Sequence, residues 1–506
     1  MFAVSFSFRM TETLLQPSKS LTIILSNTEV NSYMPSTAST ETSSRTRILL
    51  LVTILLLGGL AWILRESIGG RGQAFFGVLF FIGLAAACSD NLGNVNWRTI
   101  ATGLALQFML GVLILKVDIV YSGFEVMGAM VAKFLEFANV GSEFVFGPLA
   151  NHLKSEGAFG VGSGFIFAVR ALPTVIFISA VFTVMYHLRI LQAIVWFFAK
   201  AMLLIFGSKG VSGAETLAAT ANVFMGQTEA PLIIKPYVAT MTRSELLALM
   251  IGGMATVSGG IMAVYIGMGG DPVAILATSV MAAPCGLYLS KLLIPETMDP
   301  VTRGEIKVAD ERTHINLVDA AAGGASDGMM LVLNIIAMLI AFIAGIAMIN
   351  YLLMLSGQGI NTLIARVGFA FQFPTLSLEL VFSKVFSPIA FLMGVAPEDA
   401  PRVGELLGKK LVLNEFVAFS DLTNLNAIRE NDKFVGVKGI QERSYRLAVY
   451  ALTGFANISS IGIQLGGIGA MAPNRRSDLA SLGMRALLGG FLATLINASI
   501  AGILMD

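Results

Sequence analysis

Long apolar runs, separated by short polar segments, recur along the chain from residue 48 to its end. A helix needs about 20 residues to cross the hydrocarbon core of a bilayer, and most of these runs have about that length. Their pattern predicts an all-α polytopic membrane protein. The predicted spans are residues 48–64, 73–88, 99–117, 165–186, 190–207, 246–268, 272–293, 329–355, 445–471 and 479–505; the mixed segments 122–138 and 312–328 are predicted to be interfacial helices.

The beginning of the chain differs from the rest. Residues 1–47 are rich in Ser and Thr and hold no sustained apolar run, so we predict a disordered tail, with Met34 as an alternative start. The run 48–64 fits either the core of a signal peptide or a first membrane helix. Arg65 and Glu66 follow it, and no small-residue cleavage site does, so the membrane helix is the favoured interpretation.

Two stretches are long enough for a hairpin but carry a carboxylate and amides in their middle, residues 212–241 and 402–429. Each precedes an apolar helix interrupted by small and hydroxyl residues, TVSGG at 256–260 and NISSIG at 457–462. Two such pairs are typical of transporters built from inverted repeats, whose site lies near the middle of the bilayer. The sequence therefore predicts two re-entrant helical hairpins and two broken transmembrane helices.

The first hairpin has a polar triplet at its centre, Gln227 to Glu229, between Gly226 and Pro231. A charged residue at membrane depth costs several kcal/mol by most estimates, and broken backbone is tolerated there only where a cavity, ion or ligand satisfies it. The alternative is a loop outside the membrane whose polar residues face water. The apolar flanks favour the membrane interpretation.

Two further polar groups have more ordinary alternatives. Residues 414–419 read NEFVAF and follow Lys409 and Lys410, so an amphipathic surface helix explains Glu415 equally well. Residues 455–460 read FANISS inside an apolar run, where Ser and Asn commonly bond to neighbouring helices. The occurrence of all three groups in one chain favours a binding site.

Composition agrees with a membrane protein and excludes several other classes. Of 506 residues 55% are hydrophobic and 13% are charged, against roughly 25% charged in soluble domains. The net charge of +1 gives no reason to expect nucleic-acid binding. Two cysteines and three histidines form no disulfide framework or metal-ligand spacing. No catalytic motif or Cys–His pairing occurs, so we expect no enzyme and no cofactor.

Several longer motifs make the chain similar to the concentrative nucleoside transporter family of bacterial type. The resemblance runs from about residue 73 to the C-terminus, and the tail and the run 48–64 lie outside it. The motifs are GQTEAPLIIKPY at 226–237, SGG at 258–260, NEFVAF at 414–419, GFANISSIGIQLGG at 454–467, NWRT at 96–99, ALQFMLGVLIL at 105–115 and ALPTVIFISAVF at 171–182.

The resemblance implies a homotrimer in which each protomer has a static scaffold and a mobile transport domain. It places the base of a nucleoside on Gln227, Thr228, Glu229 and Ile261, and the ribose on Glu415, Phe455, Asn457 and Ser460. A sodium site would use the side chains of Asn222 and Thr256 with the carbonyls of Met225 and Val257. Three departures from the family pattern are Thr256 for serine, Phe419 for tyrosine and Lys235 for arginine.

We expect the chain to be organised in six segments. These are the tail 1–47; an extra helix and linker 48–72; N-terminal helices and an interfacial helix 73–210; the first hairpin, its broken helix and the next helix 211–295; a loop, interfacial helix and long scaffold helix 296–400; and the second hairpin, its broken helix and the last helix 401–506.

The chemistry of these residues agrees with a nucleoside and a hard cation. A carboxylate accepts hydrogen bonds from ribose hydroxyls, while an amide such as Gln227 both donates and accepts, as a base edge requires. Sodium prefers oxygen ligands, which unwound carbonyls and Asn or Thr side chains supply. No Lys/Arg cluster lies within the motifs, which favours nucleosides over nucleotides.

The sequence therefore predicts a secondary active transporter of the plasma (inner) membrane that carries nucleosides such as uridine into the cell with sodium by alternating access. Proton coupling is the main alternative, with Glu229 as the protonated group. A channel or a membrane-embedded enzyme is a less favoured alternative. Pyrimidine or purine preference and stoichiometry are left open.

Overall fold

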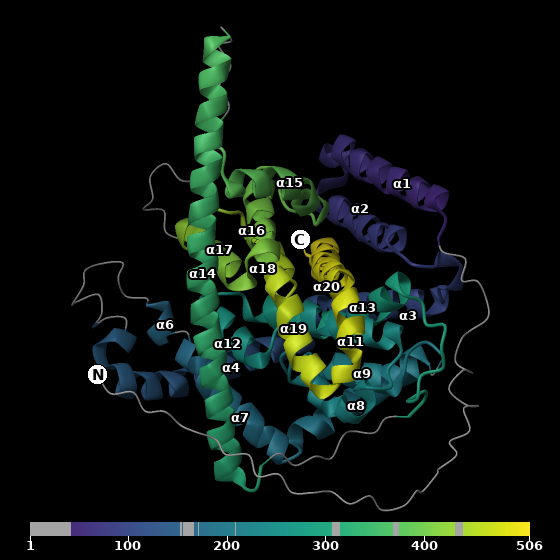
Figure 1. Ribbon diagram of the computed structural model, residues 1–506, viewed down its shortest axis with the longest axis vertical. Coiled ribbons are helices and arrows are strands. Elements are labelled where there is room, and N and C mark those ends of the chain that lie inside the picture. Colours follow the sequence, from purple (N-terminus) through teal and green to yellow (C-terminus); the bar gives the residue numbers. More distant parts are fainter. Residues whose placement is uncertain are drawn as a thin grey trace, which may run out of the picture. The chain divides into compact units, whose positions relative to one another are not determined.

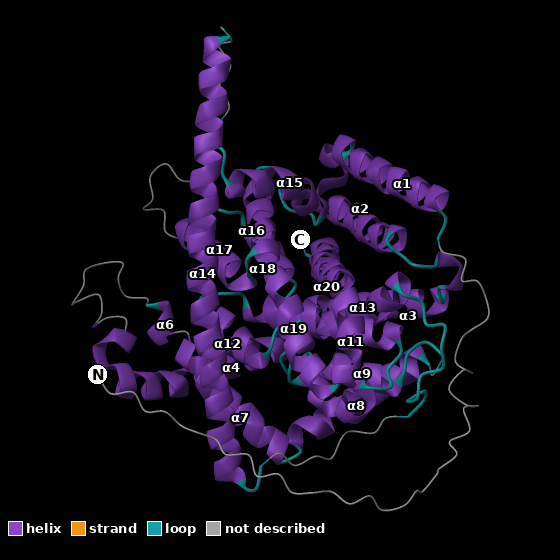
Figure 2. Ribbon diagram, viewed as in Figure 1, coloured by secondary structure: helices purple, strands orange, loops and turns teal. Residues whose placement is uncertain are grey.

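The structure is a computed structural model that describes residues 42–151, 154, 166–170, 172–207, 209–305, 314–367, 374–430 and 439–505. Within these ranges the secondary structure is helical and no strand occurs (Figure 2). Most of the predicted tail 1–47 lies outside the described residues. Its last four positions are already helical, because α1 begins at Ser44, where the side chain of Ser43 caps the helix by accepting from Thr46 N–H.

Eight helical stretches of the described chain are long and apolar enough to cross a membrane, which confirms the predicted fold class. They differ in how much protein surrounds them. In Ser44–Ile63 (α1) and Leu317–Ile364 (within α14), 11% of the most apolar part of the helix is buried. In Arg243–Gly267 (α11 and α12), Pro272–Leu293 (α13) and Pro473–Leu504 (mostly α20) the buried share is 89%. The last group forms the centre of the packing, and the others cover it. The stretches are Ser44–Ile63, Arg65–Ala87, Trp97–Lys116, Phe167–His187, Arg243–Gly267, Pro272–Leu293, Leu317–Ile364 and Pro473–Leu504.

Figure 1 labels the helices that precede the first hairpin. They are α1 (Ser44–Ile63), α2 (Arg65–Ala87), α3 (Trp97–Lys116), α4 (Asp118–Phe146), α6 (Phe167–Arg170), α7 (Leu172–His187) and α8 (Ile190–Phe206). The extra first helix α1 is present, and it packs on α2 and, through an edge contact of Trp62 with Phe391 at 5.0 Å, on α15 (Leu378–Leu392).

The first polar stretch forms a broken hairpin followed by a broken helix, as expected. It comprises α9 (Gly213–Ala221), a non-helical tip at 222–229, a 3₁₀ turn (Ala230–Ile234) and α10 (Lys235–Val238). Helix α11 (Arg243–Ala255) then stops, and α12 (Gly259–Gly267) begins after a three-residue break. Pro231 ends the tip because it stands at the start of the 3₁₀ turn, where no N–H is needed.

The second stretch repeats the arrangement. Helices α16 (Ala400–Val412) and α17 (Glu415–Glu430) form the hairpin, and α18 (Glu442–Leu452) and α19 (Ile458–Met471) form the broken helix. The two breaks meet, because Phe455 N–H donates to the carbonyl of Thr256 at 3.1 Å. Helices α13 (Pro272–Leu293) and α20 (Arg476–Leu504) pack behind both broken helices.

Of the two predicted interfacial helices, only the one at 312–328 needs correction, because α4, which contains 122–138, is not among the eight stretches that can span a membrane. Residues 122–138 lie within the longer α4, and residues 317–328 are the first turns of α14 (Leu317–Arg366), continuous with the span after them. Helix α14 has 50 residues, about 75 Å at 1.5 Å per residue, so it is far longer than the roughly 30 Å hydrocarbon core. Residues 320–322 are three alanines, and alanine is the best helix former, so the helix continues through them into the span.

Small residues let α14 lie directly against α7, as Figure 1 also shows. A Cβ on Gly324 would lie 2.7 Å from the carbonyl oxygen of Ser179, and one on Gly328 would lie 2.7 Å from the Cα of Ile176. Glycines four residues apart are a common way for membrane helices to approach closely. This contact fixes α7 and α14 as one wall of the site described below.

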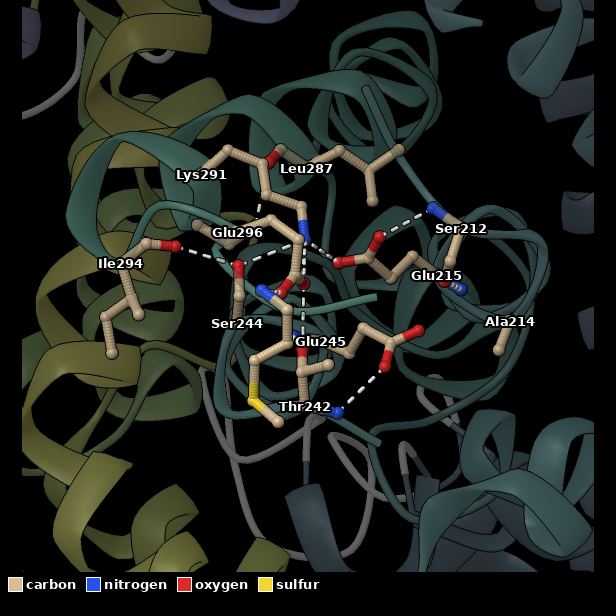
Figure 3. Close-up of polar contacts among 12 residues, drawn as sticks. Ser212, Ala214, Glu215, Thr242, Ser244, Glu245, Leu287, Lys291, Ile294 and Glu296 are labelled. Carbon is tan, nitrogen blue, oxygen red and sulfur yellow. Dashed lines mark hydrogen bonds and ion pairs between the residues drawn. The ribbon is translucent and has the colours of Figure 1, made fainter. Parts of the chain in front are cut away.

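A buried ion cluster holds the first hairpin to the core (Figure 3). The ammonium of Lys291, near the end of α13, forms an ion pair with Glu215 of α9 and a second one with Glu296 at 3.2 Å. It also donates to Ser244 Oγ at 3.0 Å. Lys291 and Glu215 are at most 3% exposed.

The same cluster caps two helices. Glu215 accepts from Ser212 N–H at 2.8 Å at the start of α9, and Glu245 accepts from Thr242 N–H at 2.8 Å at the start of α11. Carboxylates are stabilised at the positive N-terminal ends of helices. The N-terminal ends of α9 and α11 therefore help Lys291 to neutralise the neighbouring carboxylates. The cluster holds the first turn of α9, the first turn of α11 and the end of α13 together.

We expect Lys291→Met to lower the stability of the protein by about 3 kcal/mol or more, because it leaves buried carboxylates without their cation. The double variant Lys291→Met/Glu215→Gln should lose less than the sum of the single losses, since it removes both charges. Thermal unfolding in detergent measures both. Lys133→Met, at an exposed lysine of α4, is the control and should change Tm little; additive losses in the double variant would contradict the assignment.

Candidate functional site

The structure contains a partly open cavity of about 900 Å³, lined by residues of the two hairpins, the two helix breaks, α7 and α14. Both repeats contribute polar side chains to it. The eight residues predicted to bind substrate all line this cavity: Gln227, Thr228, Glu229, Ile261, Glu415, Phe455, Asn457 and Ser460. They come from both hairpins and both broken helices, and Gln227 and Ser460 are 233 positions apart in the sequence.

On the side of the first hairpin, the tip offers an amide, a hydroxyl and a carboxylate. Gln227 Nε2 donates to Ser460 Oγ at 3.2 Å, and its Oε1 is buried without a hydrogen-bond partner. Glu229 Oε2 accepts from the backbone N–H of Gly226 at 3.0 Å, which folds the tip back on itself. Ile261, in the first turn of α12, adds an apolar surface.

On the side of the second hairpin, Glu415 and Asn457 form a buried pair. Asn457 Nδ2 donates to Glu415 Oε2 at 2.6 Å. Asn457 also caps α19, because its Oδ1 accepts from Ser460 N–H at 2.9 Å. Glu415 lies in the first turn of α17, where the helix end favours a negative charge. Its exposure of 3% excludes the alternative of a surface helix.

One buried cation beside this pair was not assigned from the sequence. Lys410 is fully buried, and its ammonium donates to the carbonyl of Ala451 at 2.6 Å and to Thr494 Oγ1 at 3.0 Å. These bonds join α16 to the end of α18 and to α20. The sequence showed only a basic pair at 409–410; Lys409 instead lies in ion pairs with Glu405 and Asp421.

The residues predicted to bind sodium meet at the ends of two helices. Asn222 follows α9, and both its Oδ1 and Nδ2 are buried without a hydrogen-bond partner. Its Nδ2 lies against Gly252 of α11, whose carbonyl accepts from Thr256 Oγ1 at 2.9 Å. The C-terminal ends of α9 and α11 are negative ends of helix dipoles. An unpaired buried amide at such a place suits a hard cation with oxygen ligands.

Met225 and Val257 flank the contact between the tip and the break. Gly259 N–H donates to the carbonyl of Phe224 at 2.9 Å, which brings the backbone at 222–225 beside 256–259. Within the described chain no group of three or more His, Cys, Asp or Glu side chains is placed to hold a metal. The cation ligands available at this place are therefore amide, hydroxyl and carbonyl oxygens.

The third wall of the cavity was missed in the sequence. Helix α7 contributes Ser179 and Thr183, and α14 contributes Asp327 and Asn334. Each of these four residues is a polar residue inside an apolar stretch. That pattern alone does not show whether its side chain faces a binding site, a neighbouring helix or the membrane interface. Among the family departures, Lys235 lines the cavity.

Phe419 does not line the cavity. It is fully buried and stacks on Tyr265 with ring centroids 4.2 Å apart and planes 7° apart. The departure from tyrosine at this position therefore changes packing between α17 and α12 and leaves the groups lining the cavity unaltered.

Family models match most of the chain. The model described as Na+ dependent nucleoside transporter C-terminus matches residues 274–502, and its N-terminal counterpart matches residues 76–149. A third, described as Nucleoside recognition, matches residues 168–272, which include the first hairpin. The three matches together cover both broken helices and most of the cavity-lining residues.

Curated proteins of the same kind are similar over almost the whole chain. Human sodium/nucleoside cotransporter 1 is 39% identical over 462 residues, which are 90% of this chain and 67% of that protein. An uncharacterized transporter of Haemophilus influenzae is 40% identical over 435 residues, 85% of this chain and 97% of that one. The chain thus spans about two thirds of the length of the mammalian relatives and nearly all of the bacterial one.

Solved structures of CNTnw have the same fold. The inward-facing substrate-bound state has a TM-score of 0.75 and 35% identity, and covers 85% of this chain and 97% of that one. An outward-facing state has a TM-score of 0.77 at 35% identity and covers 86% and 97%. With its helical spans, paired hairpins and matched motifs, the chain belongs to the family of sodium-dependent nucleoside transporters.

Proposed function

We propose that this protein is a secondary active symporter that moves nucleosides into the cell together with sodium. The observation that carries the proposal is the single cavity that brings eight polar and apolar residues of both hairpins and both broken helices together. A cavity of about 900 Å³ accommodates a small molecule. The apolar helices make the protein an integral, multi-pass membrane protein, and its family is that of sodium-dependent nucleoside transporters, which supports the plasma membrane as its location.

The two sides of the cavity suit the two halves of a nucleoside. The buried carboxylate of Glu415, oriented by Asn457, accepts hydrogen bonds from ribose hydroxyls. Gln227, Thr228 and Glu229 face the base, and Gln227 has an unpaired oxygen for a base-edge donor. Phe455 and Ile261 supply apolar contact. Unpaired buried groups penalise a wrong base, which gives the site its selectivity.

Sodium is proposed to bind at Asn222 and Thr256 with the carbonyls of Met225 and Val257, next to the base side of the cavity. The unpaired carboxamide of Asn222 supports this site, because a buried amide is costly unless a ligand satisfies it. Proton coupling through Glu229 is the competing proposal. The protein carries its substrate chemically unchanged and uses no cofactor.

Alternating access is proposed to move the hairpins and broken helices as a unit against α7 and α14, in a homotrimer. CNTnw is known in inward-facing and outward-facing states, and this chain has the same fold. The Lys291 cluster supports a rigid unit, since it fastens α9, α11 and α13 together. The six segments drawn from the sequence remain the proposed organisation of the chain, with two changes: the first helix begins at Ser44, and residues 317–328 belong to α14.

Uptake into proteoliposomes tests the proposal directly. Radiolabelled uridine should accumulate against its gradient when sodium is high outside, and the accumulation should collapse when a sodium ionophore is added. Accumulation driven by an imposed proton gradient in the absence of sodium would instead establish proton coupling. Equilibration without accumulation under either gradient would indicate a channel.

Glu415→Gln should weaken uridine binding by about 1.5–3 kcal/mol, because a hydrogen bond to a charged group is worth about that much. A 2′,3′-dideoxy analogue lacks the partner hydroxyls, so the same substitution should cost it much less. Isothermal titration of the purified protein at saturating sodium measures all four affinities. Equal losses for both ligands would place the ribose elsewhere.

Asn222→Ala and Thr256→Ala should raise the sodium concentration required for half-maximal uridine binding, since each removes an oxygen ligand. Uridine affinity at saturating sodium should change much less, because the two ligands occupy separate but coupled sites. Sodium titrations at fixed uridine provide the measurement. Thr220→Ala, a hydroxyl elsewhere on α9, is the matched control and should leave the sodium dependence unchanged.

A further inference from the structure

Each repeat brings the end of a hairpin helix to the end of the first half of a broken helix. In the first repeat these helices are α9 and α11, and in the second they are α16 and α18. The C-terminal end of a helix is the negative end of its dipole, so each meeting place favours a cation. In transporters built from inverted repeats, such ends and the unwound carbonyls beside them coordinate the driving ion. The chain therefore has two places of the same kind.

The two helix breaks are also built alike. Thr256 ends α11 and Thr453 ends α18, and each donates its hydroxyl to the carbonyl four residues earlier, at 2.9 Å and 2.7 Å. Each break then closes with a side chain that caps the second half of the helix. Ser258 accepts from the N–H three residues ahead at 3.4 Å, and Asn457 does the same at 2.9 Å. The backbone of the two repeats thus offers similar ligands at the two breaks.

The two places differ in what they offer a positive charge. The first holds the unpaired carboxamide of Asn222, where sodium is proposed to bind. The second holds the ammonium of Lys410, which comes from the last turns of α16 and is fully buried. It donates to the carbonyl of Ala451, at the end of α18, at 2.6 Å and to Thr494 Oγ1 of α20 at 3.0 Å. A charged side chain therefore occupies the end of α18.

Lys410 is held in the way a hard cation is held. Its partners above are a carbonyl and a hydroxyl, the neutral oxygens that also bind sodium. Thr494 donates its own proton to a carbonyl of α20 at 2.9 Å, so its oxygen is left to accept. The carboxylate of Glu415 adds a longer-range attraction. Lys291 is bound differently, because its ammonium forms ion pairs with two carboxylates.

We propose that Lys410 is a tethered cation that fills, in the second repeat, the position that sodium is proposed to fill in the first. A covalently attached charge cannot leave, so this repeat keeps its cation throughout the transport cycle, and an ion from solution is required at the first repeat only. The inference rests on the proposed function, because it takes the sodium site at Asn222 and Thr256 as its reference.

Replacing the tethered charge with space tests the proposal. Lys410→Ala removes the ammonium and leaves room and oxygen ligands for a free cation, whereas Lys410→Met removes the same charge but keeps most of the volume. At the sodium concentration that saturates the parent, both variants should bind uridine about tenfold or more weakly. Raising sodium should restore binding to Lys410→Ala and not to Lys410→Met. The Hill coefficient for sodium should then exceed that of the parent by about one in the alanine variant.

Titration calorimetry over a sodium series, with choline keeping the ionic strength constant, measures these affinities. Thermal unfolding makes the same comparison without substrate, so a poorly folding variant still decides the question. Sodium should raise the Tm of Lys410→Ala by more than it raises that of the parent, and choline should not. Lys410→Met should show only the rise of the parent.

Three results would overturn the proposal. The first is a sodium response of Lys410→Ala that equals that of the parent, in binding and in Tm. The second is failure of Lys410→Ala to fold at every sodium concentration, since a free cation would then not replace the ammonium. The third is recovery of Lys410→Met with sodium, because methionine leaves no room for an ion.

Lys409→Ala is the matched control. Lys409 is the neighbouring lysine on α16, but its ammonium is in ion pairs with Glu405 and Asp421. The control should keep the Hill coefficient of the parent, and a rise in it equal to that of Lys410→Ala would also overturn the proposal.

The outcome is distinguishable from failure of the proposed function. If neither uridine binding nor the Tm of the parent responds to sodium, the proposed sodium coupling is wrong. If the parent responds to sodium and Lys410→Ala gains no further response, only the role of Lys410 is wrong.

Discussion

The hydrogen bond from Phe455 N–H to the carbonyl of Thr256 joins the two interrupted helices, and the arrangement of the site depends on it. Each interruption leaves backbone groups unpaired, which a membrane protein tolerates only inside protein or at a cavity. One backbone group of each break is paired with the other break, and side chains of both breaks line the same cavity. The side of the cavity formed by the first hairpin and the side formed by the second thereby acquire a defined separation.

Around this junction, buried charges hold the hairpins to the helices packed behind them. Lys291 joins α9, α11 and α13, and Lys410 joins α16, α18 and α20. Each lysine is surrounded by carboxylate, hydroxyl or carbonyl oxygens, as a buried ammonium must be. In each repeat one lysine ties the hairpin to helices of the core. These contacts hold one part of the cavity lining together, and α7 and α14 form a separate wall of the same cavity.

Much of the site could be read from the sequence because polar residues inside apolar runs are expensive and so report function. Glu229 and Glu415 were found in this way, and their neighbours came with the family motifs. Asp327 and Asn334 were not found, since a single polar residue on a long helix has several ordinary explanations. The start of α14 was also mistaken for a separate helix, because its small residues resemble an interfacial segment although they continue the helix.

By itself the sequence determined the membrane class, most of the spans, the two hairpins and both helix breaks, since length, hydropathy, glycine and proline act locally. The predicted spans 190–207 and 445–471 are not among the eight stretches, because α8 and α19 are shorter helices. Motif and chemistry also predicted eight substrate-binding residues, and all eight line one cavity. Only the tertiary structure decided which distant groups meet: Ser460 beside Gln227, Lys291 beside Glu215, and Asn222 left unpaired against Gly252. Such pairings depend on how helices dock, and burial makes each of them energetically important without leaving any periodic signal in the chain.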